Sequence, residues 1–583
     1  MFWNAIRNDH RYVNKRGLNW RGKRGKMSES TKIILAVILM ILICLLIEYL
    51  SNLRKQKLNQ RRIVNEYGEE IDIEDVSYKM ESVSSYFRNK NKEYVIDDIT
   101  WSDLSMDNVF KKINNTQSTV GNEILYDILR NPLKDKSKLI KRDNIIEYFS
   151  ENEKERIDLQ LLFSRLGYNY DSNTTLSIFT EIDNSKNRLT LYRALRALPV
   201  ISIILVAINK SFVFLTLLSI CLNIFISFNN KKSKVDVSGF SYIIKVVNVA
   251  FKIQSKNLNI INENMNDISY DLQQVKKIKK KRVSTNPNSM LSDLNVLSEY
   301  TNMIFLSELI TYEKVKETVI KNKEYLKNIY EFVGTLDSLI AVSSFRQSLD
   351  YYSKPELFIS NNKSENLIDF EQLYHPLVEN PVSSSLHTEN GILVTGSNAS
   401  GKSTFIKSVA INQILGQTIF TTCAKSYKAS FFNIYTSMAL KDDVLKNESY
   451  YIVEIKSLKR IIDKSKEKIP TLCFVDEILR GTNTIERIAS SSEVLSYFND
   501  SNCICFAATH DIELTYLLEN KFENYHFEEE ITDNDIVFDY KLRSGRAKSR
   551  NAIKLLGLMG YDEKIIEEAN ERAAIFVRTG KWK

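Results

Sequence analysis

The C-terminal part of the chain alternates short, continuously apolar runs with segments of helical periodicity. The runs are Ile392–Val394, Thr471–Val475 and Cys503–Ala508. Runs this short and this apolar are typical of strands buried on both faces of a parallel sheet. After the first run, apolar residues recur at the spacing of one helix face, at Phe405, Ile406, Val409, Ile411 and Ile414. The pattern predicts an α/β domain in which strands alternate with helices.

Upstream of this region, apolar positions follow a helical period over long stretches. Segments Gly239–Lys281 and Met290–Tyr351 are rich in Lys, Asn, Leu and Ile and contain almost no Gly or Pro. This composition predicts long helices, which we interpret as lever-like. The chain of 583 residues has room for two or three domains, and an all-α part is expected to precede the α/β part.

One apolar stretch lies near the N-terminus. Ile33–Ile47 is unbroken, has basic residues on both sides and extends to Leu53 if Glu48 lies at the membrane interface. At about 1.5 Å per residue, this stretch is long enough to span a bilayer. A secretory signal peptide is the competing interpretation, but no small-residue cleavage site follows, so we expect a retained anchor.

A second apolar region has two arms, Ala197–Ile208 and Phe212–Phe228, separated by Asn209–Ser211. The first arm is short unless Arg193 and Arg196 extend to the interface, which leaves open a buried hairpin inside a soluble core. The second arm contains seventeen residues without a charge. That length of uncharged chain favours a transmembrane hairpin.

The positive charge is unevenly distributed. The chain has a formal net charge of +8, and residues 1–26 hold eight Lys/Arg and one Asp. The rest therefore sums to about +1 and lacks the strongly basic balance of many nucleic-acid binders. A local basic cluster remains at Lys276–Arg282, before a turn predicted at Pro287. It reads as a solvated face or a lipid contact, or alternatively as a contact to DNA or RNA phosphates.

The candidate chemistry begins in the loop after the first predicted strand. Its sequence fits the pattern G-x-x-x-x-G-K-[ST], in which glycines let backbone N–H groups turn toward phosphate oxygens and the following helix adds partial positive charge. Lys402 would reach the β- and γ-phosphates of ATP, and the hydroxyl of Ser403 would bind Mg²⁺. A Gly/Ser turn without a ligand is the alternative, but the strand and helix on either side match the required context. The predicted phosphate-binding residues are Gly396, Ser397, Asn398, Ala399, Ser400, Gly401, Lys402, Ser403 and Thr404.

Two further strands end in polar residues. Asp476 and Glu477 follow Thr471–Val475, and Thr509-His510 follow Cys503–Ala508. Ligands bind at the carboxyl edge of an open α/β sheet, so we expect Asp476 in the Mg²⁺ shell, Glu477 as the residue that polarises the attacking water, and His510 as a γ-phosphate sensor. The alternatives are an acidic strand end and a structural histidine.

These motifs, in this order, resemble the ATPase domain of the MutS family, the DNA mismatch-repair ATPases related to ABC cassettes. The family's phosphate loop appears with Ser397 in place of Pro and with Asn398 kept. Residues 476–484 match Asp-Glu-x-x-Arg-Gly-Thr-x-Thr, and residues 508–515 match Ala-Thr-His-x-x-Glu-Leu-Thr. The resemblance implies an ATPase that uses ATP and Mg²⁺, with Lys402, Glu477 and His510 as its catalytic residues.

The resemblance also implies a dimer. The segment from Asp442 to Ile455 resembles the family's signature segment, with Asn447 where the family usually has Gly. Ser449 is kept, and in the family this serine reaches the nucleotide bound by the partner subunit. His375-Pro-x-x-Glu379 resembles the lead-in to the adenine site, which adds His375 to the nucleotide-binding residues.

The resemblance covers most of residues 97–583. Tyr330–Tyr351 resembles the last core helix, and Asn115–Gly121 resembles the start of the family's core domain. An N-terminal mismatch-reading domain with its Phe-x-Glu wedge is not recognisable, and there is no room for a connector domain. We therefore expect the usual basis for recognising a mispair to be missing.

These observations predict six parts along the chain. They are a basic tail over 1–32, a transmembrane helix over 33–53, the first part of a MutS-like helical core over 54–192, a transmembrane hairpin over 193–230, lever helices over 231–351 and a MutS-like ATPase domain over 352–583. Because ATP is cytosolic, residues 54–192 and 231–583 would face the cytosol of a multi-pass cell-membrane protein. Three spans then put the basic N-terminus outside, against the positive-inside rule. A natural start at Met27 would remove this conflict, as would the loss of one span.

Two functions remain open. The first is a membrane-tethered, DNA-associated ATPase whose dimerisation follows its nucleotide. The second is a membrane ATPase that acts on membrane helices or a protein partner without binding DNA. The near-neutral body favours the second function, and the family resemblance favours the first.

Overall fold

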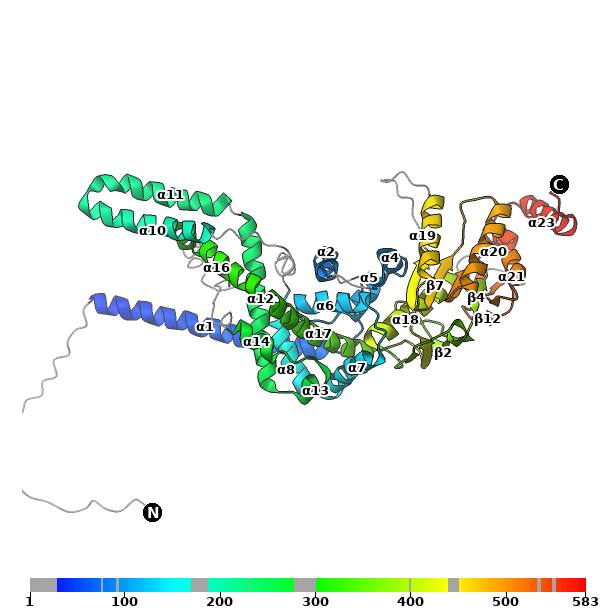
Figure 1. Ribbon diagram of the computed structural model, residues 1–583, viewed down its shortest axis with the longest axis horizontal. Coiled ribbons are helices and arrows are strands. Elements are labelled where there is room, and N and C mark those ends of the chain that lie inside the picture. The colour runs from blue at the N-terminus through cyan, green and yellow to red at the C-terminus, as the bar shows by residue number, and fades with distance from the viewer. Residues whose placement is uncertain are drawn as a thin grey trace, which may run out of the picture. The chain divides into compact units, whose positions relative to one another are not determined.

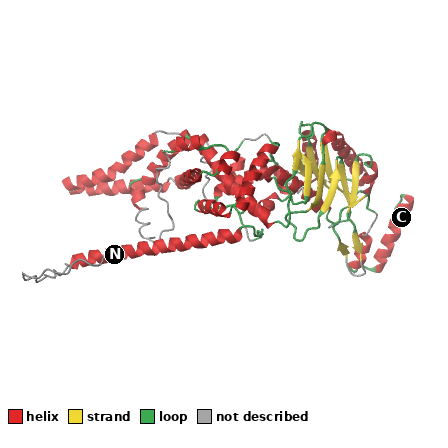
Figure 2. Ribbon diagram, turned by 90° about the horizontal axis from the view of Figure 1, so that it is seen from below, coloured by secondary structure: helices red, strands yellow, loops and turns green. Residues whose placement is uncertain are grey.

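The computed structural model describes residues 29–74, 77–90, 94–168, 187–229, 231–276, 300–397, 400–438, 450–531, 536–547 and 552–582. The chain divides into two compact units, residues 1–58 and residues 59–583. The described part of the first unit belongs to helix α1 (Glu29–Glu66), which contains the predicted anchor Ile33–Leu53. In the second unit a helical part precedes the sheets along the chain (Figures 1 and 2). The predicted order of an all-α part and a C-terminal α/β part is confirmed.

The larger sheet has six strands in the order β12-β9-β4-β8-β7-β6. The strands are β4 (Gly391–Thr395), β6 (Asn433–Ser437), β7 (Thr471–Asp476), β8 (Cys503–Ala508), β9 (Phe522–His526) and β12 (Arg543–Ser544). All neighbouring pairs are parallel except β12 with β9. The carboxyl ends of β4, β8 and β7 therefore meet at one edge, where β4 leads directly into helix α18 (Lys402–Ile419).

Helices cover both faces of this sheet. Along β4, Ile392 and Val394 belong to the hydrophobic core that includes α18, whereas Leu393 belongs to a second core. The second core is completed by helices α19 (Tyr450–Lys464), α20 (Thr484–Asp500) and α21 (Ile512–Leu517). Because successive side chains of a strand point to opposite faces, a continuously apolar strand supplies both cores.

The C-terminal α/β part also contains a smaller sheet, which the sequence pattern did not indicate. Its strands are β1 (Glu356–Phe358), β2 (Ile368–Leu373), β3 (Ser384–Thr388) and β5 (Ser426–Ser430), in the order β1-β5-β2-β3. β1 pairs with β5 in parallel, and β2 pairs with β5 and β3 antiparallel. A separate antiparallel pair is formed by β10 (Glu529–Ile531) and β11 (Ile536–Phe538).

Helix α17 (Lys323–Ser348) is the centre of the helical part. It packs against α6 (Thr119–Arg130), α7 (Lys136–Glu151) and α12 (Lys231–Lys256). Asp337 of α17 is buried and accepts hydrogen bonds from the Gln117 N–H, at 3.0 Å, and from the Ser118 hydroxyl, at 2.5 Å. Asp337 thereby holds Ser118, the N-cap residue of α6, whose hydroxyl oxygen accepts the Gly121 N–H at 3.1 Å.

The other described elements lie in the helical part, around the smaller sheet or at the C-terminal end. They are α2 (Met80–Val83), α3 (Ser85–Arg88), α4 (Asp98–Asp103), α5 (Met106–Ile113), α8 (Glu153–Ser164), α10 (Asn187–Ile208), η1 (Lys210–Phe212), α11 (Val213–Asn229), α13 (Asn259–Asn264), α14 (Ser269–Val275), α16 (Ser307–Lys321), η2 (Lys363–Glu365), α22 (Ala552–Leu558) and α23 (Glu563–Thr579).

Within the described residues, the segments predicted to form long lever helices are mainly helical, with interruptions. α12 ends at Lys256, and Asn257 has φ of 49°, after which α13 and α14 follow. In the second segment, Asn322 separates α16 from α17. Asparagine tolerates left-handed and bridging backbone conformations, so it ends a helix without a Gly or a Pro. Periodicity predicted the helices but not these breaks.

Two helices of the second unit are long and apolar enough to cross a membrane, judged by length and composition alone. They are Arg188–Ile208 and Lys210–Asn229, and 17% and 11% of their most apolar windows are buried. α10 and α11 pack against each other, and the buried Asn223 of α11 donates to the Leu195 carbonyl at 3.1 Å. The predicted break lies between them, where the Asn209 side chain accepts from the Ser211 N–H at 3.0 Å.

The helical part is anchored to the C-terminus of α18. The Leu133 N–H donates to the Gln417 carbonyl at 2.7 Å, and Arg142 donates to the Thr418 carbonyl. Arg346 of α17 donates to the Phe420 carbonyl at 2.9 Å and to Asp143 of α7 at 2.6 Å. The carbonyls at the end of α18, which lack partners within the helix, therefore bind groups from α7, from α17 and from the segment that precedes α7.

Candidate nucleotide-binding site

The loop between β4 and α18 needs glycine at both of its ends. Gly396 has φ of 149° and Gly401 has φ of 104°. A Cβ added to Gly396 would lie 2.8 Å from Ser400 Oγ and 2.9 Å from the Phe527 carbonyl oxygen, which is too close for any side chain. The loop therefore turns tightly enough for α18 to begin at Lys402. Asn398 and Ala399, two of the predicted phosphate-binding residues, lie outside the described residues.

Lys402 lies inside this turn and is 5% exposed. Its Nζ donates to the carbonyl oxygens of Gly396, at 2.9 Å, and Ser397, at 2.6 Å. Burial lowers the pKa of Lys402, and the nearby carboxylates of Asp476 and Glu477 oppose that shift. Ser397, which stands where the resembling family has Pro, donates its hydroxyl to Glu529 at 2.7 Å.

Ser400 carries a buried polar atom that the protein does not satisfy. The residue is 1% exposed, and its Oγ has no hydrogen-bond partner among the described residues. A buried hydroxyl without a partner is costly, so native structures usually supply one from the protein, water or a ligand. Ser400 lies in the loop whose N–H groups would surround phosphate oxygens, and a bound phosphate would complete its hydrogen bonding. This observation fits a nucleotide phosphate in the loop.

Ser403 and Asp476 meet across the sheet edge. Ser403, in the first turn of α18, donates its hydroxyl to Asp476 Oδ2 at 2.5 Å, and Asp476 ends β7. Burial raises the pKa of Asp476, and the hydrogen bond from Ser403 lowers it. A hydroxyl beside a carboxylate, next to phosphate oxygens, is the ligand set that Mg²⁺ takes in nucleotide sites. Thr404, the last predicted loop residue, is exposed in the same turn.

Glu477 and His510 come from neighbouring strands and touch. Glu477 Oε1 lies 3.1 Å from His510 Nε2, and Glu477 Oε2 lies 2.6 Å from Arg480 Nη1. The backbone of Glu477 donates to the Ala508 carbonyl at 2.9 Å and has φ of 55°. β7 therefore delivers the carboxylate to the end of β8, where Thr509 and His510 follow. Arg480 belongs to the Asp-Glu-x-x-Arg-Gly-Thr-x-Thr segment, but it was not predicted as a site residue.

A cavity of about 480 Å³ adjoins the loop. Ser400–Phe405 and Glu477 line one side, and His375, Val378 and Val382 line another. This volume and its mixture of apolar and polar walls suit a small-molecule ligand. The remaining lining residues are Leu373, Glu379, Asn380, Pro381, Ser384, Ser408, Phe527 and Tyr540.

His375 is held in its neutral form. It is 9% exposed, and burial lowers its pKa to about 4, with the charge of Lys407 acting in the same direction. Its Nδ1 accepts the Leu377 N–H at 3.1 Å, so the proton of the neutral ring is on Nε2. Tyr540 also reaches this cavity, and sequence reasoning missed it because it lies far along the chain in an irregular segment.

The site predicted to act in trans depends on the segment before α19. Asn447 and Ser449 lie within residues 439–449, outside the described residues. Within the described part of the chain, three or more His, Cys, Asp or Glu side chains do not gather into a metal-binding group. At Ser403 and Asp476, phosphate oxygens and water would complete the ligand set for Mg²⁺, because this ion usually keeps several waters and binds few protein groups.

Comparison with known proteins agrees with this geometry. Residues 392–576, which hold β4, the loop, Asp476, Glu477 and His510, match the family model of MutS domain V. Over this part of its length, the chain is similar to MutS proteins. The match begins at the strand that precedes the loop and ends within α23.

Similar curated proteins carry the name DNA mismatch repair protein MutS. The protein from Clostridium kluyveri is 27% identical over 350 residues, which cover 56% of this chain and 38% of that protein. The one from Natronomonas pharaonis is 28% identical over 276 residues, covering 45% and 31%. The one from Rickettsia canadensis is 27% identical over 317 residues, covering 52% and 34%. The matched regions thus cover about a third of the length of these MutS proteins.

Proposed function

We propose that the chain binds Mg-ATP and hydrolyses it to ADP and phosphate. One observation carries this proposal: buried Lys402, the Ser403–Asp476 hydrogen bond and the Glu477–His510 contact lie together at one sheet edge. The parts needed to hold phosphates, a divalent cation and an attacking water are thus contributed by three adjacent strands. MutS domain V covers all of these residues.

Each side chain has a distinct part in this proposal. Lys402 would exchange its two loop carbonyls for phosphate oxygens, and Ser400 would donate its hydroxyl to a phosphate. Ser403 and Asp476 would hold Mg²⁺, which neutralises phosphate charge when bound. The apolar wall at Val378 and Val382, with neutral His375, would accept the base.

Glu477 would orient and polarise the attacking water. Its two oxygens now contact Arg480 and His510, so at least one contact must open before the carboxylate can accept a hydrogen bond from water. His510, displaced from Glu477 or shared with it, would then lie beside the terminal phosphate. Whether the Glu477 carboxylate is available to the attacking water would therefore depend on whether the terminal phosphate is bound.

The test of this function compares two variants. Glu477→Gln should keep ATP binding and lose turnover by about 10²-fold or more, because the amide cannot polarise water. Lys402→Ala should weaken both binding and turnover. Nucleotide titration and phosphate release measure the two effects. Equal turnover in Glu477→Gln and the unaltered protein would contradict the assignment.

We further propose a homodimer with Ser449 acting in trans. This proposal comes from the signature segment, and α19 begins at Tyr450, directly after Ser449. Glu477→Gln loaded with ATP should accumulate as a dimer, and Ser449→Arg should prevent it by placing a bulky side chain in the interface. Mixing Ser449→Arg with Lys402→Ala chains can restore one composite site, so partial turnover is expected. A Glu477→Gln protein that stays monomeric in saturating ATP would exclude the shared site.

Two functions can follow from such an engine. The names of the relatives support a DNA-associated role, and we expect DNA binding without mismatch preference, since we recognise no wedge that would unstack a base step. The alternative is mechanical work on membrane helices or a protein partner, which the apolar α10 and α11 favour. In either case we propose the cell membrane as the location, with lipids around α10, α11 and Ile33–Leu53 and the ATPase domain cytoplasmic. The six-part division of the chain is proposed on the same basis.

Salt-dependent binding to homoduplex, mismatched and branched DNA separates the two. A DNA-associated protein should lose affinity steeply with salt and lose more when Lys276–Arg282 is neutralised. Of that cluster only Lys276 is among the described residues. A mismatch preference of tenfold or more would contradict our expectation, and intact turnover without DNA binding at low salt would favour the mechanical function.

A further inference from the structure

The turn that carries Glu477 has an unusual backbone. Glu477 has φ of 55° and Leu479 has φ of 54°, so two residues with side chains adopt left-handed conformations within three positions. Left-handed conformations are unfavourable for residues with a side chain and persist only where the surroundings impose them. Ile478 and Leu479 are 2% and 5% exposed and are packed into the core under α19 and α20. The turn is therefore held against its own backbone preference.

Part of what holds it comes from Glu454, on α19. Glu454 is 3% exposed, and its Oε1 accepts the backbone N–H of Leu479. Burial raises the pKa of Glu454, while the N–H groups of Leu479 and Arg480 stabilise its charged form. Its second oxygen, Oε2, is buried and has no hydrogen-bond partner among the described residues. Burying a carboxylate without an ion-pair partner is costly and therefore rare. Its hydrogen bond to the turn is what keeps Glu454 in this position.

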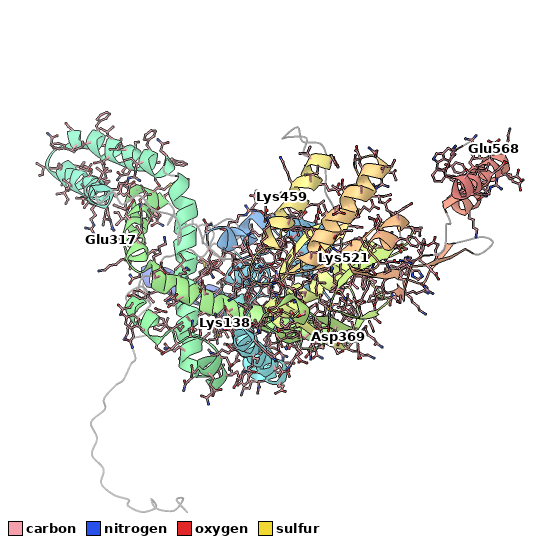
Figure 3. All side chains as sticks on the ribbon, turned by 45° about the vertical axis from the view of Figure 1, so that its right-hand side comes forward. Lys138, Glu317, Asp369, Lys459, Lys521 and Glu568 are labelled. Carbon is pink, nitrogen blue, oxygen red and sulfur yellow. The ribbon has the colours of Figure 1, made fainter. Side chains whose placement is uncertain are left out.

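A second contact from α19 reaches the same turn. A Cβ added to Gly481 would lie 2.9 Å from the Cβ of Tyr451, so the backbone of the turn lies directly against α19 at this point. Tyr451 and Glu454 are three residues apart and therefore project from one face of the helix. α19, which carries Lys459 in Figure 3, thus touches the turn on both sides of Arg480.

We propose that Glu454 is a positioning residue for Glu477: it holds the 477–481 turn in its left-handed conformation and so sets where the catalytic carboxylate lies. This inference rests on the proposed ATPase function. α19 begins one residue after Ser449 and is continuous to Glu454. A displacement at the start of α19 would therefore be transmitted through Glu454 to the Glu477 of the same chain. The helix connects the residue proposed to contact the partner's nucleotide with the chain's own water-polarising group.

Glu454→Ala removes the acceptor and should separate turnover from binding. Because a misplacement of about 1 Å can cost about 10²-fold in rate, we expect kcat to fall by about tenfold to 10²-fold. The dissociation constant for ATP should stay within about threefold, because Lys402, Ser400 and Ser403 do not contact Glu454. Glu454→Gln keeps an oxygen that can accept from Leu479 and should recover most of the lost kcat.

The matched control is Ser457→Ala on the same helix. Ser457 is 2% exposed, and its Oγ has no hydrogen-bond partner among the described residues. This substitution changes the interior of α19 without removing a contact to the turn, so kcat should be unchanged. Gly481→Ala disturbs the turn from the other side of the contact and should lower kcat in the same way as Glu454→Ala.

Amide hydrogen exchange supplies a readout that does not depend on turnover. In Glu454→Ala, a peptide covering residues 476–483 should exchange faster, whereas peptides from α18 should be unchanged. Normal kcat in a folded Glu454→Ala protein, or unchanged exchange in this peptide, would overturn the proposal. So would an equal loss of ATP binding and kcat. If Glu454→Ala does not fold, two other results would overturn the proposal. One is a folded Glu454→Gln protein whose kcat is far below that of the unaltered protein, and the other is a Gly481→Ala protein with normal kcat.

The two proposals fail differently. If the unaltered protein hydrolyses no ATP, the proposed function fails, but the exchange experiment still tests whether Glu454 holds the turn. If the unaltered protein hydrolyses ATP and Lys402→Ala abolishes this, an unaffected Glu454→Ala rejects the positioning role alone.

Discussion

At the scale of single residues, the polar groups of the site either have no hydrogen-bond partner among the described residues or bind a group that a ligand could replace. Lys402 uses carbonyl oxygens of its own loop, Glu477 is paired with Arg480 and His510, and Ser400 has no partner among the described residues. Buried polar groups normally find stable partners, so these contacts mark places where a ligand can compete.

The hydroxyl of Ser400 should have opposite effects on stability and affinity. Ser400→Ala removes a buried, unpartnered hydroxyl, so without nucleotide the free energy of unfolding should stay the same or rise by about 1 kcal/mol. ATP affinity should fall about tenfold, since a hydrogen bond to a charged phosphate is lost. Thermal unfolding and nucleotide titration measure the two quantities. Ser457→Ala removes a similar hydroxyl on α19 and should leave affinity unchanged. Unaltered ATP affinity in Ser400→Ala would exclude the phosphate contact.

Burial of neutral His375 should make stability depend on pH. Its pKa is lowered from 6.5 to about 4 in the folded protein, so the unfolded chain binds more protons between these values. The free energy of unfolding should therefore fall as the pH drops from 6.5 toward 4, by about 3 kcal/mol in total. Chemical denaturation across this range measures it, and His375→Gln should remove this part of the dependence. His387, whose side chain is 63% exposed, provides the control. An identical pH dependence in His375→Gln would contradict the assignment.

At the scale of elements, α18 connects the phosphate loop to the helical part. Its N-terminus forms the loop and its C-terminal carbonyls bind Leu133, Arg142 and Arg346. A helix moves as a rigid rod over this length, so a displacement at the loop would reach α7 and α17 directly. The physical connection between the loop and the helical part is therefore the helix that follows the loop.

Arg346 should be the strongest single contact of this junction. It is 4% exposed and binds Asp143 at 2.6 Å, while Lys354 also binds Asp143 at 2.9 Å. Arg346→Ala should lower the free energy of unfolding by about 3 kcal/mol, because buried carbonyls and a buried carboxylate lose their donor. Lys459→Ala breaks the exposed pair with Asp463 and should leave the free energy of unfolding nearly unchanged, because water screens this pair. Chemical denaturation compares them, and equal losses would show that the junction carries no special weight.

At the scale of the whole molecule, a domain similar to MutS domain V shares its chain with apolar helices of span length. α10 and α11 carry large exposed apolar side chains, among them Ile204 at 61%, Ile208 at 77% and Phe214 at 75%. Exposed apolar surface of this kind is stable in lipid or against a partner, not in water.

The full chain should therefore partition with membranes and resist alkaline extraction. Deleting Met1–Lys26 should leave this association intact, because the proposed spans Ile33–Leu53, α10 and α11 all remain. Fractionation before and after carbonate treatment measures the effect, and a soluble cytosolic protein provides the control. Recovery of the full chain in the soluble fraction without detergent would reject the membrane assignment.

The local motifs were within reach of the sequence alone. A phosphate loop is specified by a strand, a Gly-rich turn and a helix that are neighbours along the chain, so Gly396–Thr404 could be assigned from spacing. The same holds for Asp476, Glu477 and His510, since parallel strands bring their carboxyl ends to one edge. The MutS domain V match confirms the family that these motifs indicated.

Only the tertiary structure decided the contacts between distant segments. Tyr540 in the cavity, Glu454 under the turn and Arg346 at the end of α18 each lie against residues that are distant in the sequence, so their proximity depends on long-range packing. The sheet of β1, β5, β2 and β3 depends on pairing between distant strands. The helix breaks at Asn257 and Asn322 depend on the backbone conformation of a single residue each. Periodicity reports which face of an element is buried, and it carries no information on what lies against that face.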